Sequence, residues 1–171
     1  RERHERQRLV ALDQSLQLGE RDRAVRINAD QRLRLSLPEA AQDVGAGSDD
    51  LAAARAYYDA LMPLVGYEPY VAGGDQFAYR PADGKVGTYI FFYPAGDRAG
   101  YSRDRPGLQH LAFMVRTRSA VDHAYRWAAQ RGDTVLHPPR EFPEYPPPYY
   151  AAFWTGPDGL LLEVVCHAAH G

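Results

Sequence analysis

The 171-residue sequence predicts an α+β domain built from two similar halves, each a strand, a helix and three further strands. A helix followed by three strand segments occurs twice, and the glycines that end the two helices, Gly66 and Gly132, are 66 positions apart. Asp-Gly turns the last hairpin of both halves, at residues 83–84 and 158–159, where a tight hairpin requires positive φ. A repeat of two such units favours a pseudo-symmetric pair whose facing sheets enclose a pocket.

Composition sets the class of protein. The chain is 45% hydrophobic and 25% charged, which is typical of a globular domain with one core. Cys166 is the only cysteine, so an intramolecular disulfide framework is excluded. A net charge of −2 disfavours nucleic acid and membrane surfaces as partners. There is neither a membrane-length apolar stretch nor a signal-peptide pattern, so we expect a cytoplasmic protein.

Residues 1–41 are predicted to form an N-terminal extension in which basic and acidic residues alternate along a solvated face. Leu9, Leu12 and Leu16 recur at helical spacing and predict a short amphipathic helix. The alternating segments 23–28 and 32–37 predict two strands or a hairpin. We expect the extension to pack against the domain or to mediate contact with a second copy.

The first half, which we call module one, spans residues 42–95. A helix begins at a cap formed by Ser48, Asp49 or Asp50 and runs to Gly66. Turn residues divide the rest of the module into three strands, at residues 67–72, 76–80 and 88–93. Residues 43–48 precede the helix where a strand is expected, but they lack β-branched and aromatic residues, so a loop is the alternative.

The second half, module two, spans residues 107–168. Its first strand, 108–115, alternates clearly between apolar and other residues, and its helix begins at Thr117 or Ser119 and ends at Gly132. Three strands come after the helix, at residues 134–138, 149–154 and 160–166. The proline-rich segment 138–148 between two of them is either a lid over a pocket or a connection.

Two ionisable residues of module two are the main candidates for chemistry. The alternation in strand 108–115 places His110 on the face away from the helix, and Glu163 interrupts the apolar run Leu-Leu-Leu-Glu-Val-Val. A carboxylate in such a strand is costly to bury without a partner, and the two side chains could meet across the sheet. Imidazole and carboxylate are half of a divalent metal site, but a buried hydrogen-bonded pair that binds nothing is the alternative.

The order of motifs resembles one known superfamily. The segments His110-Leu-Ala-Phe, Tyr149-Tyr-Ala-Ala-Phe, Gly156-Pro-Asp-Gly and Leu162-Glu-Val-Val are similar to the second half of a vicinal oxygen chelate domain. This is the superfamily of glyoxalases, bleomycin-resistance proteins and ring-cleaving dioxygenases. Residues 50–58 and the pair Gly66-Tyr67 resemble its first half, so the likeness covers about residues 42–168. It implies paired βαβββ modules around a cleft.

The resemblance also implies roles for individual residues. His110 and Glu163 fall at the first-strand and last-strand positions of module two that usually bind a divalent metal in this superfamily. Asp43 occupies the first-strand position of module one, either as a third ligand or as a solvated loop residue. The last-strand position of module one falls near Thr88 or Ile90 and lacks a carboxylate. The implied cofactor is iron, manganese or zinc, or no metal at all.

Aromatic and other side chains around the expected site are candidates for contact with a substrate. We expect the substrate to touch a set of residues on the sheets, namely Tyr89, Phe91, Met114, Tyr149 and Phe153. Tyr149 and Tyr150 are adjacent in a strand, so only one of them can face the pocket. His137 and Tyr145 are the candidates for proton transfer.

Two functional hypotheses from different classes remain. The first is a metal-dependent lyase, isomerase or dioxygenase that acts on a small oxygenated or aromatic molecule. The second is a small-molecule binding protein without metal, as in the antibiotic-sequestering members of the superfamily. Domains of this superfamily often pair, so a homodimer is the expected assembly.

Overall fold

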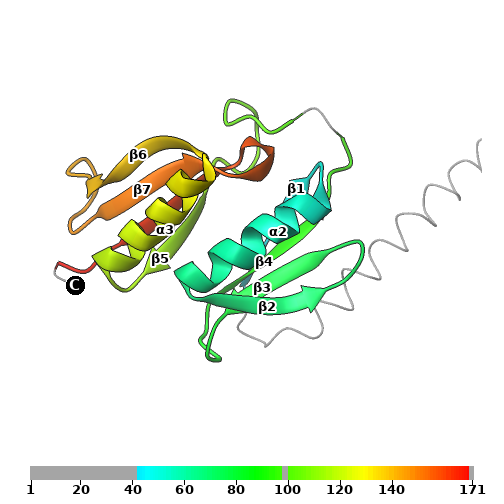
Figure 1. The fold of residues 1–171 in the computed structure, drawn as a ribbon, viewed down its shortest axis with the longest axis horizontal. Helices are drawn as coiled ribbons and strands as arrows, with labels where there is room; N and C mark the ends of the chain where they lie inside the picture. Colours follow the sequence, from blue (N-terminus) through cyan, green and yellow to red (C-terminus); the bar gives the residue numbers. More distant parts are fainter. Residues whose placement is uncertain (1–41, 98–99, 170–171) are drawn as a thin grey trace, which may run out of the picture. The chain divides into compact units, whose positions relative to one another are not determined.

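The computed structural model describes residues 42–97 and 100–169, and the predictions made for residues 1–41 lie outside this range. Two four-stranded sheets, each with a helix, form the described domain (Figure 1), which confirms the predicted α+β architecture. Module one contains β1 (Gln42–Ser48), α2 (Leu51–Leu61), the 3₁₀ turn η1 (Met62–Val65), β2 (Tyr67–Ala72), β3 (Phe77–Pro81) and β4 (Thr88–Pro94). Module two contains β5 (Leu111–Val115), α3 (Arg118–Arg131), β6 (Thr134–Glu141), β7 (Tyr150–Thr155), the turn η2 (Pro157–Gly159) and β8 (Leu161–Cys166).

Both helices begin and end at the residues that the sequence indicates. The Asp50 carboxylate accepts a hydrogen bond from the backbone N–H of Ala53 at 2.9 Å, and the Thr117 hydroxyl accepts one from Ala120 at 3.2 Å. The caps are 67 positions apart, close to the repeat length. Gly66 and Gly132 follow the helical segments with φ of 83° and 85°, a conformation that glycine adopts without strain. Local capping therefore sets where the helical segment begins and ends in both modules.

The two sheets have the same topology. Sheet order is β1-β4-β3-β2 in module one and β5-β8-β7-β6 in module two, with the first pair of strands parallel in each. Gly45 pairs with Phe91 in module one, and Ala112 pairs with Glu163 in module two. Because Gly45 and Ala112 are also 67 positions apart, Phe91 is the structural counterpart of Glu163. The sequence placed this position near Thr88 or Ile90 and without a carboxylate, and the pairing places it at Phe91, one residue after Ile90.

Strand β1 forms despite its weak local signal. Its whole length, Gln42–Ser48, pairs in parallel with β4, so residues 43–48 are a strand and the loop alternative is wrong. A Cβ atom at Gly45 would lie 3.3 Å from the Tyr93 ring, so a larger residue there would require the ring to shift. Tertiary pairing with an apolar strand outweighs the low strand propensity of the segment.

Strand β6 extends further than the sequence indicates. It continues through Pro138 and Pro139 to Glu141, so part of the proline-rich segment belongs to the sheet. The prolines are accommodated because β6 is an edge strand, and its pairing with β7 shifts register between Val135 and His137 and again before Arg140. The segment therefore begins as an edge strand and only then turns away towards β7.

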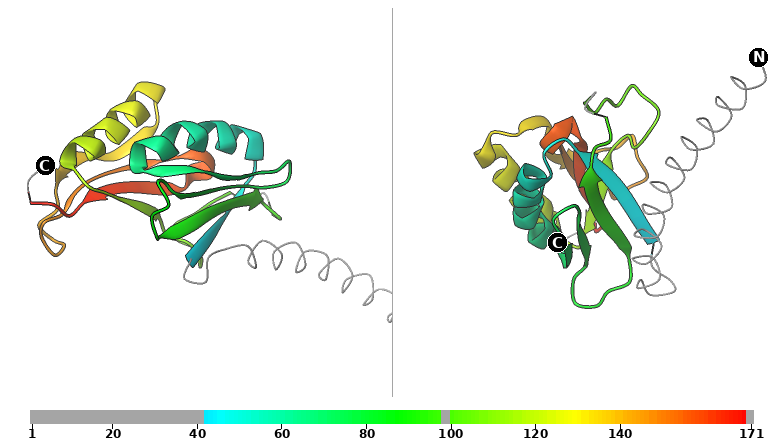
Figure 2. Two further views of the ribbon diagram at one scale, coloured as in Figure 1. Left: turned by 90° about the horizontal axis from the view of Figure 1, so that it is seen from below. Right: turned by 90° about the vertical axis from the view of Figure 1, so that its right-hand side faces the viewer.

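A shared core joins the two modules. In Figure 2 both helices lie on the same side of the sheets, and buried residues of α2, α3 and both sheets form one cluster. Within it, the Tyr57 hydroxyl accepts a hydrogen bond from Trp154 Nε1 at 2.8 Å and donates one to Asp133 at 2.7 Å. The helices thus occupy one face of each sheet and leave the opposite face for other contacts. None of the described helices is long and apolar enough to span a membrane.

Candidate functional site

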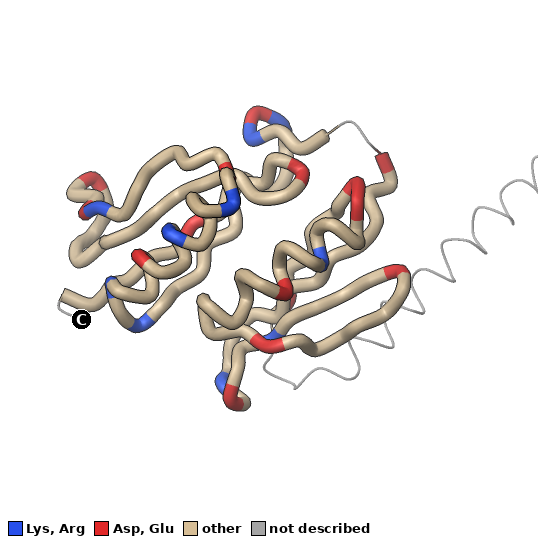
Figure 3. Tube along the Cα trace, in the orientation of Figure 1, with Lys and Arg blue, Asp and Glu red and all other residues tan. Residues whose placement is uncertain are grey.

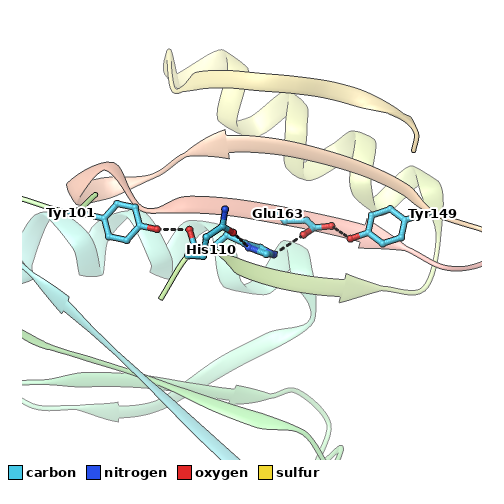
Figure 4. A network of polar contacts seen from close by, with 5 residues as sticks. Tyr101, His110, Tyr149 and Glu163 are labelled. Carbon is cyan, nitrogen blue, oxygen red and sulfur yellow. Dashed lines mark hydrogen bonds and ion pairs between the residues drawn. The ribbon is translucent and has the colours of Figure 1, made fainter. Parts of the chain in front are cut away.

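An imidazole and a carboxylate meet on the face of the second sheet opposite α3 (Figure 4). Glu163 lies in the middle of β8 with 2% of its side chain exposed, and His110 immediately precedes β5. Nε2 of His110 lies 3.1 Å from Oε2 of Glu163. Strand alternation produces this arrangement, because Leu162 and Val164 of β8 face the core on the helix side while Glu163 faces away.

Each member of the pair has a further polar partner. The Tyr149 hydroxyl donates to Oε1 of Glu163 at 2.5 Å, so both oxygens of the carboxylate are in contact with the protein. Nδ1 of His110 contacts the side-chain oxygen of Gln109. The Tyr101 hydroxyl, at the far end of the row in Figure 4, donates to the Leu108 carbonyl at 2.8 Å and also contacts the Gln109 carbonyl.

These contacts determine which atoms carry protons around Glu163. Burial and, secondly, the hydrogen bond to Glu163 raise the pKa of Tyr149 above its usual value, so its hydroxyl keeps its proton and acts as a donor. The Gln109 amide oxygen accepts the Nδ1 proton of His110, which leaves Nε2 as the nitrogen aimed at the carboxylate. A buried carboxylate then faces either an imidazolium proton or a cation in that position.

A pocket of about 310 Å³ lies beside the pair. Aromatic rings form much of its wall: Phe142 lies 5.2 Å from Phe153, and Tyr145 lies 4.7 Å from Tyr149, between ring centroids. The lining residues all belong to module two or to the segment before it, and they are Arg103, Gln109, His110, Leu136, His137, Phe142, Glu144, Tyr145, Tyr149, Phe153, Leu161 and Glu163.

Six of the residues singled out from the sequence line this pocket, namely His110, His137, Tyr145, Tyr149, Phe153 and Glu163. His137 packs edge-on against Phe142 and Phe153, at 5.6 and 5.8 Å. The prediction that Tyr149 and Tyr150 face opposite sides of the strand is confirmed, since the Tyr150 hydroxyl donates to Asp122 of α3 at 2.8 Å.

The other four lie elsewhere. Tyr89 and Phe91 are buried in module one, where Tyr70 packs edge-on against Tyr89 at 4.9 Å. Met114 is 73% exposed on β5 and does not line the pocket. Asp43 is an exposed residue of β1 and does not line it either. Strand parity identifies a face of a sheet, but not which sheet carries the pocket, so the sequence could not place these four residues relative to it.

The donor set for a metal is incomplete within the described residues. No group of three or more His, Cys, Asp or Glu side chains there is close enough together to hold an ion, so Asp43 does not join His110 and Glu163. The pair itself has suitable geometry. Two ligands of one ion at about 2.0–2.2 Å lie about 2.9–3.4 Å from one another, depending on the coordination angle, and the observed separation is 3.1 Å. The pair therefore fits two positions of a divalent-metal shell and leaves the others open.

Several lining residues were not expected from the sequence. Gln109 directly precedes His110, and this adjacency was a usable signal, since metal-binding or catalytic histidines are usually oriented by a neighbouring acceptor. Arg103 and Phe142 reach the pocket from loops, for which the sequence carries no periodicity.

Along the described chain as a whole, basic and acidic residues are interspersed (Figure 3).

The sequence was also compared with known proteins. The pattern that defines the Glyoxalase/Bleomycin resistance protein/Dioxygenase superfamily matches residues 30–164. The chain belongs to this superfamily. A glyoxalase-type protein of Bacillus halodurans of known structure is 30% identical, with a TM-score of 0.62, and the match covers 75% of this chain and 96% of that one.

Two further proteins are similar to this chain. The uncharacterized protein YqjT of Bacillus subtilis is 27% identical over 119 residues, which are 68% of this chain and 90% of that protein. The structure of lactoylglutathione lyase from Agrobacterium tumefaciens is 19% identical, with a TM-score of 0.53, over 75% of this chain and 94% of that one. At that level of identity the second match is evidence for the fold alone.

Proposed function

We propose that this chain is a glyoxalase-superfamily enzyme that acts on a small oxygenated or aromatic molecule, with a divalent metal held by His110 and Glu163. The observation that carries the proposal is the 3.1 Å contact between Nε2 of His110 and Oε2 of a carboxylate that is 2% exposed. A buried carboxylate is stabilised by a positive charge beside it, and a divalent ion would supply one. The nitrogen and the oxygen together suit iron, manganese or zinc.

The pocket supports the choice of substrate class. At about 310 Å³ it lies at the lower end of the range for small-molecule sites, so a single ring or a short chain is the size it accepts. Its aromatic wall suits the faces and edges of a planar ligand. A bound metal would act as a Lewis acid towards an oxygen of the substrate.

Protein side chains supply the remaining functions in this proposal. His137 is exposed in β6 and Tyr145 is 45% exposed, so water and substrate can reach both, and they are the candidates for moving a proton. Phe153 of β7 and the ring of Tyr149, which directly precedes β7, form part of the pocket wall. The reaction would be a lyase, isomerase or dioxygenase step.

Elemental analysis of protein purified without chelators tests the proposal. We expect stoichiometric metal in the natural protein and its loss in His110→Ala and in Glu163→Gln, because each change removes one of two ligands. His123→Ala is the matched control, since His123 lies on α3 and does not line the pocket. Equal trace metal in all four proteins, with no uptake of added Fe(II), Mn(II) or Zn(II), would contradict it.

A binding protein without metal is the second candidate, and a specific observation favours it. Tyr149 and His110 already occupy both oxygens of Glu163, and the described residues offer no third ligand. In that case an aromatic ligand should bind equally well with and without a chelator. Fluorescence titrations in the presence and absence of EDTA distinguish the two candidates.

Assembly is a separate part of the proposal. We propose a homodimer, for which residues 1–41 offer one contact surface through Leu9, Leu12 and Leu16. Measuring the mass in solution of the whole chain and of residues 42–171 tests this. If the extension holds the dimer together, the whole chain should have the mass of a dimer and residues 42–171 the mass of a monomer.

A further inference from the structure

The carboxylate of Glu163 is held at both of its oxygens. Oε2 faces Nε2 of His110 at 3.1 Å, and Oε1 receives the hydrogen bond of the Tyr149 hydroxyl at 2.5 Å. A side-chain carboxylate in a pocket can rotate about its last bond, so that either oxygen, or both, can face a ligand. Two partners on opposite oxygens remove this freedom and select one orientation.

The Tyr149 side chain is itself fixed. Its ring lies 4.7 Å from Tyr145 and 4.9 Å from His167, between centroids, and its backbone carbonyl accepts a hydrogen bond from the Phe142 N–H at 2.9 Å. The hydroxyl is therefore delivered to Glu163 by a packed ring and not by a mobile side chain. Holding the donor in advance means that little conformational entropy is lost when the site is occupied.

We propose that Tyr149 is a positioning residue, which fixes Oε1 of Glu163 and thereby presents Oε2, beside Nε2 of His110, to the divalent ion. This inference rests on the proposed function, because it concerns the same ion. A phenol hydroxyl that donates to Oε1 occupies that oxygen, so the carboxylate binds through one oxygen only. Figure 4 shows Tyr149 and His110 on opposite sides of Glu163, as this role requires.

Module one provides an internal contrast. Phe91 stands in the place of Glu163, and the ring nearest to it, that of Tyr93 at 6.2 Å, is stacked with it. An aromatic side chain in that position needs stacking partners, whereas the carboxylate of module two needs a donor. The hydroxyl of Tyr149 is thus matched to the one carboxylate that lies in the middle of a described strand and away from water.

Titration with Co(II), followed by calorimetry and by the visible spectrum of the bound ion, tests this role. In Tyr149→Phe we expect binding to weaken about 10- to 100-fold, as is usual when the partner of a metal ligand is removed. We also expect the spectrum to change, because the freed carboxylate can turn to bind through both oxygens. Unfolding temperatures measured without metal show whether the variant is folded.

Tyr150→Phe is the matched control. It removes the hydroxyl of the adjacent tyrosine, which donates to Asp122 on the opposite side of the strand and does not line the pocket. Its Co(II) affinity and spectrum should equal those of the natural protein. If Tyr149→Phe does not fold, Tyr149→Leu removes the same hydroxyl and takes its place in the comparison.

The outcomes separate the two proposals. Co(II) binding by the natural protein with an unchanged affinity and spectrum in Tyr149→Phe overturns the positioning role and leaves the proposed function intact. No binding by the natural protein overturns the proposed function and, with it, this inference. Equally weakened binding in both tyrosine variants would assign the effect to a general loss of stability and would also overturn the role of the Tyr149 hydroxyl.

Discussion

Module one and module two share a strand order, a helix position and a pair of capping signals, yet they differ at the two positions where we propose that a metal is held. Asp43 and Phe91 stand where module two has His110 and Glu163. In module one the second position is filled by an aromatic ring that stacks against Tyr93 at 6.2 Å. In module two it carries a carboxylate with two polar partners. The register of the sheet thus produces an equivalent position in each module, and the residue at that position determines whether it contributes to apolar packing or to a polar site.

The largest expected effect concerns whether the two modules unfold as one unit. Leu61→Ala in α2 empties a fully buried position of the shared core, and we expect a loss of about 2–5 kcal/mol in the free energy of unfolding. Both tryptophans, Trp127 and Trp154, belong to module two and contact Tyr57 of α2, so their fluorescence reports on module two and on its contact with module one. In urea, the fluorescence transition should move with the circular dichroism transition.

Val86→Ala is the control for this measurement, since Val86 is 86% exposed and its change should cost less than about 0.5 kcal/mol. If Leu61→Ala shifts the circular dichroism signal but leaves the fluorescence transition in place, the modules unfold separately.

The next effect concerns the polar contact between the modules. Tyr57→Phe removes the hydroxyl that accepts from Trp154 Nε1 and donates to Asp133. The indole N–H is then buried without an acceptor, so we expect a loss of about 1–3 kcal/mol, measured by urea unfolding. Tyr58→Phe is the matched control, because Tyr58 is equally buried and its hydroxyl makes no hydrogen bond within the described residues. Equal losses in the two variants would argue against a role for the hydroxyl.

The smallest effect is a dependence on alkaline pH that both modules should share. A tyrosine hydroxyl donates to a helix aspartate in each, Tyr79 to Asp59 and Tyr150 to Asp122. Burial and, secondly, the bond to Asp122 raise the pKa of Tyr150 to about 12, and the pKa of Tyr79 is raised by burial and by its own bond to Asp59. The unfolded value is about 10.

A folded pKa above the unfolded one means that the stabilising contribution is complete below about pH 10 and is lost as the pH rises through about 12. The free energy of unfolding of the natural protein should therefore approach that of Tyr150→Phe between these values. A difference that stays constant from pH 8 to pH 12 would show that the bond does not hold the proton.

Sequence patterns anticipated the elements whose signals are local. Alternation in residues 108–115 and 160–166 predicts that His110 and Glu163 can meet across one face of the sheet, and their side chains lie 3.1 Å apart. The pairing of Phe91 with Gly45 could not be predicted, because residues 88–93 are a continuous apolar run that does not distinguish one register from the next. The contact of Tyr149 with Glu163 could not be predicted either, because it depends on how the loop after β6 returns to the sheet.

The prolines of β6 have a consequence for how chains meet. Pro138 and Pro139 lack backbone N–H groups and lie on an outer border of the second sheet, next to two irregularities in its pairing. Each proline removes one donor from this strand, which makes it a poorer template for another strand and lowers the tendency of this side of the sheet to aggregate edge to edge. The opposite border, β5, contains no proline over its five residues and keeps its donors. Protection against fibre-like growth is therefore one-sided in this sheet.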